Sequence, residues 1–232
     1  MRLTGIIDYT MDNFLCVRGF ASMLQLSEIS KADEKIQRDL IDDHRGEMEN
    51  FLSDGRFTFF PEVILGANMC GTEMDKDKIN TLRETVRAES KSLKIKINNI
   101  KYVIKRNAVK KENNDLAFDV TQTVIMQFDK DSLVGKEFLR IDGNHRLSAV
   151  NEYSTYAHKR IPFCLLLFRD AEETDKFCRA LFYNINTKQI PLKMEQNLKV
   201  IIESEQAFDD DTLLGDPSFG KNYFWTRQII KH

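Results

Sequence analysis

The segment Phe138-Leu139-Arg140-Ile141-Asp142-Gly143-Asn144-His145-Arg146-Leu147 decides the fold assignment, because its pattern changes from strand to helix at a single glycine. Residues 138–142 predict a short strand, and residues 147–153 predict a helix. Glycine at the junction lets the backbone approach a ligand closely, and the free amides at a helix start carry positive partial charge. The segment therefore predicts an anion site between the strand and the helix.

The side chains at this corner suit phosphate chemistry. Arg146 can hold a phosphate group through two parallel hydrogen bonds, and His145 adds a further donor. Asp142 can fix a metal-bound water, orient His145 or accept a proton. The alternative is a tight turn at Asp142-Gly143 followed by a solvated first helical turn. Cationic side chains oppose the dipole at a helix start, which favours an anion between them and the helix.

Composition limits the possible classes of protein. The chain has 232 residues, of which 42% are hydrophobic and 30% charged, so it can form a real core. A formal net charge of -2 excludes a uniformly basic protein that coats nucleic acid by bulk charge. The four cysteines form no CxxC pair, and no run reaches the roughly 18 apolar residues that a bilayer requires. We expect a cytoplasmic protein without a membrane span.

We call the segment Asp142 to Arg146 the glycine corner. On both sides of it, alternating and helical patterns predict an α+β fold. Ser30-Lys31-Ala32-Asp33 resembles a capping box, and it predicts a helix that ends near Gly55. Pro61 belongs at an edge, a bulge or a break of the strand predicted over 57–66. Further strands are expected at 93–105 as a hairpin, at 116–126 as its antiparallel neighbour and at 161–168 as a central strand, with helices at 171–183 and 192–203.

These elements predict one domain over residues 1–204. Residues 205–220, with Asp209-Asp210-Asp211 and Gly215-Asp216-Pro217, are expected to form a solvated loop. Residues 221–230 look like the start of another element, so 205–232 is either an extension or the beginning of a further helical segment.

Residues 91–111 contain eight basic residues and no acidic one, which reverses the sign of a mildly acidic protein. A hairpin with such charges can follow a phosphate backbone, and its affinity then falls as salt rises. The alternative is that these residues form the solvent-exposed face of an edge hairpin, where lysines prevent edge-to-edge aggregation. The predicted DNA contacts are Lys94, Lys96, Lys101, Lys105 and Arg106.

A polar segment further along the chain predicts a second wall for the phosphate pocket. Short amides and a hydroxyl can reach phosphate or magnesium-bound water, and a lysine supplies a point charge. The alternative is a helix end whose polar residues cap the last carbonyls before Pro191. The residues of this wall are Asn184, Asn186, Thr187 and Lys188. Cys164 and Cys178 are expected to be core residues instead of nucleophiles.

Three motifs in order resemble the DGQHR-domain family, which includes the DndB proteins of DNA phosphorothioation systems and lies within the ParB/sulfiredoxin superfamily. The resemblance spans about Gln37 to Glu203. Asn144 stands where the family has glutamine, and sulfiredoxins have their catalytic cysteine there. The motifs are Ile141 to Ala149, the segment with Gln37-Arg38, Arg45, Glu47 and Arg56 to Leu65, and Phe182 to Leu192.

The resemblance implies a ParB/sulfiredoxin-like mixed sheet with flanking helices and a nucleoside triphosphate site, for ATP or CTP, at Gly143, Asn144, His145 and Arg146. Weak hydrolysis would use Mg²⁺ near Asp142, with Arg146 neutralising charge, His145 orienting the γ-phosphate and Asp142 positioning water. It also implies association with DNA, with other DNA-modification or phage-defence proteins, and possible homo-oligomers.

Other activities stay open from the sequence. A ParB-like metal-dependent nuclease would require Asp142, Glu62 and His145 around one metal ion. A small-molecule phosphotransferase is a further alternative, because the superfamily includes a serine kinase. A binding module that keeps only the fold is the last.

Overall fold

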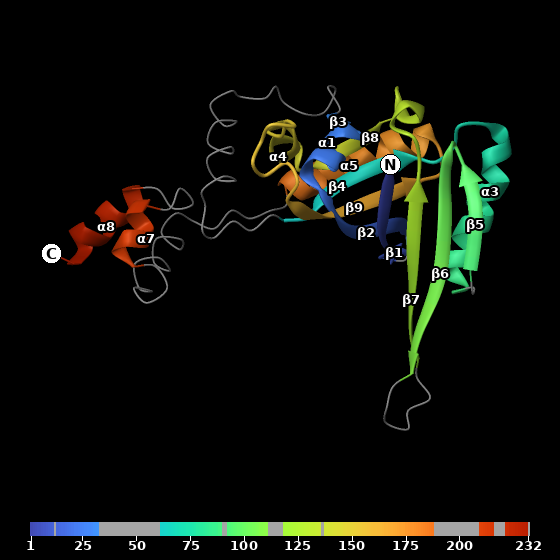
Figure 1. Cartoon of the computed structure of the whole chain (residues 1–232), viewed down its shortest axis with the longest axis horizontal. Helices are drawn as coiled ribbons and strands as arrows, with labels where there is room; N and C mark the ends of the chain where they lie inside the picture. Colours follow the sequence, from blue (N-terminus) through green and yellow to red (C-terminus); the bar gives the residue numbers. More distant parts are fainter. Residues whose placement is uncertain are drawn as a thin grey trace.

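The computed structural model describes residues 1–11, 13–32, 61–89, 92–110, 118–135, 137–187, 209–215 and 221–231. Within these ranges the fold is a mixed sheet of nine strands with helices packed on it (Figure 1). The strand order is β3-β8-β4-β9-β2-β1-β7-β6-β5. The strands are β1 (Arg2–Thr10), β2 (Phe14–Ser22), β3 (Ser30–Ala32), β4 (Val63–Asn68), β5 (Ser92–Ile97), β6 (Ile100–Lys110), β7 (Phe118–Gln127), β8 (Phe138–Asp142) and β9 (Arg160–Phe168).

The helices are short except for two. They are α1 (Met23–Glu28), α3 (Glu73–Arg87), the 3-10 turn η1 (Lys130–Leu133), α4 (Asn144–Ser148), α5 (Ala171–Thr187), α7 (Asp210–Gly215) and α8 (Lys221–Lys231). In the described part of the chain, none of them is long and apolar enough to cross a membrane. The α+β class predicted from the sequence is confirmed.

The pairing of the strands divides the sheet into two parts. In the first part β4 runs parallel to β9 and β3 runs parallel to β8, while β8 is antiparallel to β4. In the second part β2, β1, β7, β6 and β5 are antiparallel throughout. The predicted central strand β9 lies between β4 and β2 and is buried over most of its length. That burial explains its nearly continuous apolar sequence.

The two long helices cover opposite faces of different parts of the sheet. Ile79, Leu82 and Val86 of α3 belong to the main core, together with Tyr102 and Ile104 of β6. Helix α5 packs against β8, β4 and β9 on the other face. There it forms a second cluster in which Cys178 joins Cys16 and Cys164, so Cys164 and Cys178 are core residues as predicted.

The hairpin and its neighbour are also confirmed. β5 and β6 pair through a turn at Asn98 and Asn99, whose φ angles of 43° and 65° suit a two-residue hairpin turn. β7 is antiparallel to β6 along its full length. Figure 1 shows β6 and β7 extending together past the end of β1.

Several predicted boundaries are wrong. Ser30 to Ala32 is strand β3 instead of a helix start, because Phe138 of β8 pairs with Ser30 while the Ser30 hydroxyl donates to the Leu26 carbonyl oxygen at 2.6 Å. Residues 33–60 of the predicted helix and strand lie outside the described residues, as does the predicted helix at 192–203. Pro61 precedes β4.

The remaining corrections concern shorter elements. The helix predicted over 147–153 begins earlier, at Asn144, and ends at Ser148. Residues 210–215 of the predicted loop form α7, whose first turn contains Asp210 and Asp211. Acidic side chains stabilise a helix start, so the acidic run favours a helix there. The apolar segment after it forms α8, as expected.

Candidate functional site

The glycine corner is a packed junction between β8 and α4. Gly143 has φ 91° and is buried, and a Cβ atom there would lie 2.5 Å from Cγ1 of Val63 in β4. The glycine is therefore required both by its left-handed backbone and by its contact with β4. The α4 helix has five residues, so its dipole is much weaker than the sequence suggested.

Asp142 and Arg146 form an ion pair at this corner. Nη2 of Arg146 lies 2.7 Å from Oδ2 of Asp142, and Nη1 donates to the Pro61 carbonyl oxygen at 2.8 Å. His145 between them is exposed. Phosphate binding by Arg146 and metal binding by Asp142 stay predictions, and both require that a ligand compete with this pair.

Asn144 has a structural partner that the sequence reasoning missed. Nη1 of Arg140 donates to Oδ1 of Asn144 at 3.1 Å and to Oγ of Ser148 at 2.9 Å. Nε of Arg140 donates to Oγ of Ser30, and Nη2 donates to the carbonyl oxygens of Ser27 and Ser30. Burial lowers the pKa of Arg140 to about 10, so the side chain keeps its charge at neutral pH. The sequence feature that indicates such a buried partner is Arg140 itself, a charged residue between the apolar Leu139 and Ile141 of a predicted strand.

The predicted second wall is described only in part. Asn184 is exposed on α5, which packs against β8. Asn186 and Thr187 are the last residues of α5, and Lys188 lies outside the described residues. A shared pocket between this segment and Gly143 stays a prediction.

The carboxylates of the nuclease alternative have other partners. Oε1 of Glu62 lies 3.6 Å from Nε of Arg18, and Asp142 pairs with Arg146. Among the described residues, no group of three His, Cys, Asp or Glu side chains is placed to hold a metal ion.

The basic hairpin presents most of its predicted contacts on one face of the sheet. Lys96 of β5 pairs with Lys101 of β6, which pairs with Gln127 of β7, which in turn pairs with Arg2 of β1. Side chains of directly paired residues lie on the same face, so these four form one row across the sheet. Lys94 is two residues from Lys96 on β5, and Lys105 is four residues from Lys101 on β6, so both lie on the same face as this row. All of these side chains are exposed.

Arg106 is the exception among the predicted DNA contacts. It pairs with the buried Gln122 and alternates with Lys105, so its side chain is on the opposite face. That face is the one on which Tyr102 and Ile104 pack against α3.

A shallow hollow of about 640 Å³ opens at the end of the basic row. Its lining includes Arg2, Lys96, Lys101, Asn99, Gln127 and the single carboxylate of Asp129. None of the three cationic side chains forms an ion pair with another described residue. The hollow is therefore a positively charged depression that is open to an anion.

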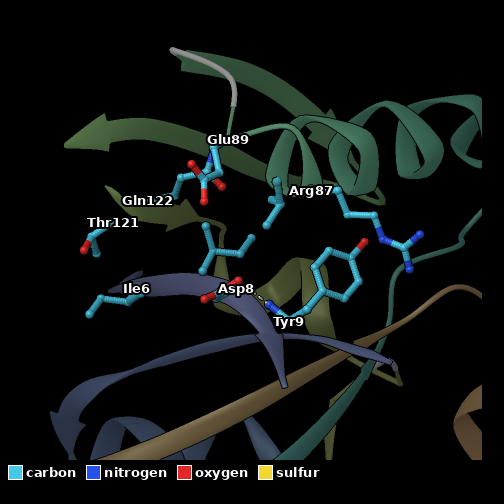
Figure 2. Close-up of a pocket in the computed structure, with 9 residues that line it drawn as sticks. Ile6, Asp8, Tyr9, Arg87, Glu89, Thr121 and Gln122 are labelled. Atoms are coloured by element: carbon cyan, nitrogen blue, oxygen red, sulfur yellow. Dashed lines mark hydrogen bonds between the residues drawn. The ribbon is translucent and has the colours of Figure 1, made fainter. Parts of the chain in front are cut away.

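The opposite end of β1 carries charges of both signs. Pairing between β1 and β7 stops after Ile6 and Thr123, and a cavity of about 610 Å³ lies beyond this point. Figure 2 shows Asp8, Glu89 and Gln122 around it, with Tyr9 beside Arg87. The guanidinium carbon of Arg87 lies 4.8 Å from the centre of the Tyr9 ring, a cation–π contact. Two carboxylates and one guanidinium line this cavity, so it lacks the excess of cations found in the hollow at Arg2, Lys96 and Lys101.

Comparison of the chain with models of protein families, with curated proteins and with solved structures finds no match.

Proposed function

We propose that this chain binds DNA through the face of β5, β6, β7 and β1 opposite α3, on which no described helix packs. The observation that carries the proposal is the row Lys96, Lys101, Gln127 and Arg2, in which the three cations have no ion-pair partner among the described residues. Lys94 and Lys105 add charge to the same face. Cations that are free of intramolecular partners can neutralise phosphates and release the counterions bound to DNA.

Protection of an edge strand does not account for this arrangement. β5 is the edge of the sheet, so Lys94 and Lys96 would serve that role. Lys101 and Lys105 are on β6, and Arg2 is on β1, which is paired on both sides. Cations on inner strands contribute nothing to the protection of an edge.

The position of the charge also explains how a protein with net charge -2 can bind a polyanion. The basic row and the cavity of mixed charge at Asp8, Arg87 and Glu89 lie toward opposite ends of β1. A phosphate backbone is therefore attracted to the end at which cations are in excess.

The test is fluorescence anisotropy with a labelled DNA oligonucleotide, measured over a series of salt concentrations. The variant is the double substitution Lys96→Ala with Lys101→Ala. We expect weaker binding, and a slope of log affinity against log salt that is smaller by about 2. A variant that binds like the wild type would overturn the proposal.

The matched control is Lys76→Ala with Lys78→Ala. It removes the same charge from α3, which covers the other face of the sheet. We expect the control to bind DNA like the wild type. Equal weakening by both double variants would mean that bulk charge alone governs binding, and the proposed face would be wrong.

A further inference from the structure

The uncovered sheet face carries an apolar row beside the basic one. Thr4 of β1 pairs with Ile125 of β7, and Ile125 pairs with Val103 of β6. Gly5 pairs with Gly19 of β2, so the next residue of β2, Phe20, lies beside Thr4 on this face. Phe20 is 58% exposed, while Ile125 and Val103 are half-buried. An exposed aromatic ring thus continues a strip of aliphatic side chains across the strands.

Cations lie on both sides of this strip. The row with Arg2, Lys101 and Lys96 is two residues away along each strand, about 7 Å. A second row lies two residues away in the other direction along each strand. It runs from Lys105 of β6 through Thr123 of β7 and Ile6 of β1 to Arg18 of β2. The strip is therefore an apolar lane between two rows that contain positive charge.

None of the described helices packs over the lane. α3 packs on the opposite face of these strands. α5 is on the same face as Phe20, but it packs against β8, β4 and β9. Among exposed large apolar side chains, Phe20 and Ile6 share this face at 58% and 49% exposure. Both side chains lie beside cations of the two flanking rows. Arg2, Lys101 and Lys105 form no ion pair with another described residue, whereas Arg18 pairs with Glu62.

We infer that this lane binds single-stranded DNA, with bases on the Phe20, Ile125 and Val103 strip and phosphates along the flanking cations. This inference rests on the proposed DNA-binding function and specifies its substrate. A duplex keeps its bases stacked inside and would present hydrated phosphates to the apolar strip. A single strand can place its bases on that strip while its phosphates reach the cations at the sides.

The width of the sheet sets the size of the contact. β2 and β6 are separated by β1 and β7, so the lane is about 14 Å long at roughly 4.8 Å per strand. A four-stranded sheet with several aromatic side chains stacks about two or three bases, whereas this lane offers one aromatic ring, Phe20, and the aliphatic Ile125 and Val103. Phe20 is the side chain on which a base would stack. Because every base can stack on an aromatic ring, we expect binding with little sequence preference.

The experiment compares a labelled oligo-dT strand, a duplex of equal length and an oligo-rU strand by fluorescence anisotropy. We expect the wild type to bind dT at least tenfold more tightly than the duplex. Phe20→Ala should weaken dT binding by about five- to one-hundred-fold, without a change in the salt slope, because no charge is lost. Phe20→Trp should bind dT at least as tightly as the wild type.

The control substitution is Tyr153→Ala, which removes an aromatic side chain that is 86% exposed and lies outside the sheet. It should leave dT affinity unchanged. The inference is overturned if the duplex binds as tightly as dT, if rU binds more tightly than dT, or if Phe20→Ala has no effect. If Lys96→Ala with Lys101→Ala still weakens DNA binding in that case, the proposed function stands and only the lane is wrong. If no oligonucleotide binds, both are wrong.

Discussion

Arg140 in β8 and Asn144 in α4 are joined across the turn at Gly143 by a hydrogen bond of 3.1 Å from Nη1 to Oδ1. The amide of the Asp-Gly-Asn-His-Arg segment therefore holds a buried guanidinium, and the bond ties the strand to the helix. Ser148 shares both partners, since its hydroxyl accepts from Arg140 and donates to Oδ1 of Asn144. The segment has a structural role that does not depend on any ligand.

Asn144→Ala tests this role through stability. Loss of the amide leaves part of a buried charged group unsatisfied, so we expect a loss of about 1–3 kcal/mol in the free energy of unfolding. Urea denaturation followed by circular dichroism measures it. His145→Ala at the exposed neighbouring position should change the stability by less than about 0.5 kcal/mol. Equal effects of the two substitutions would contradict a specific contact between Asn144 and Arg140.

Gly143→Ala and Gly135→Ala separate backbone strain from packing. Both glycines have positive φ, of 91° and 74°, but a Cβ at Gly135 meets nothing within 4 Å. We expect Gly135→Ala to lose about 1–2 kcal/mol from backbone strain alone. Gly143→Ala should lose about 2–5 kcal/mol, because its Cβ also collides with Val63. Thermal or urea unfolding gives the comparison, and similar losses would rule out the steric contribution.

Asp75 at the start of α3 makes stability depend on pH. Burial acts to raise the pKa of Asp75, but hydrogen bonds from the Gly71, Asn98 and Thr72 amides and the Thr72 hydroxyl outweigh it and lower the pKa. The charged form is therefore favoured in the folded state. Its contribution is fully present above the unfolded pKa of about 3.9 and is lost as pH falls through the lower folded value.

Asp75→Asn should reduce the stability at pH 7 by at least about 1.5 kcal/mol and flatten its decline in acid. Urea midpoints measured between pH 7 and pH 3 provide the test. The control Asp77→Asn removes an exposed carboxylate from the same helix. An identical pH profile for wild type and Asp75→Asn would show that Asp75 does not contribute.

The ion pair of Asp142 and Arg146 yields a prediction for nucleotide binding at the glycine corner. If ATP or CTP binds there, the carboxylate of Asp142 competes with the phosphates for the same guanidinium. We expect Asp142→Asn to bind nucleoside triphosphate in the absence of Mg²⁺ several-fold more tightly than the wild type and Arg146→Ala to bind it more weakly, as measured by isothermal titration. Unchanged affinity in both variants would place any nucleotide elsewhere on the molecule.

Local sequence patterns predict individual strands and helices. Which residues of distant strands lie side by side depends on the register of strand pairing, which those patterns do not contain. The alternation of Lys94 and Lys96 with apolar residues, followed by Asn98-Asn99, predicts a hairpin with one solvent-exposed face, because that pattern depends only on neighbours in the chain. Phe20 belongs to a distant segment, and its position beside Thr4 and Ile125 follows from the pairing of β2, β1 and β7. No local pattern contains that information.

The corner at Gly143 shows the opposite kind of error. The motif predicts ligand binding, whereas in the structure the turn at Gly143 brings Asp142 of β8 and Arg146 of α4 together as an ion pair. Ser30 misled in a similar way, because serine before a polar run also occurs where a short strand begins. The Ser30 hydroxyl donates to the carbonyl oxygen of Leu26, four residues earlier, and accepts from Nε of Arg140 on β8. A capping pattern reveals neither contact.

The position of β1 has a consequence for how the protein folds. β5, β6 and β7 are contiguous neighbours, so their ladder can form early and locally. β1 and β2 also form a local hairpin. The pairing of β1 with β7 joins segments more than a hundred residues apart in the chain, and the pairing of β2 with β9 is similarly distant. Such distant pairings slow folding. Residues 2–10 thus connect the β5–β6–β7 ladder to the rest of the sheet, and the proposed lane for DNA is complete only when β1 has paired with β7.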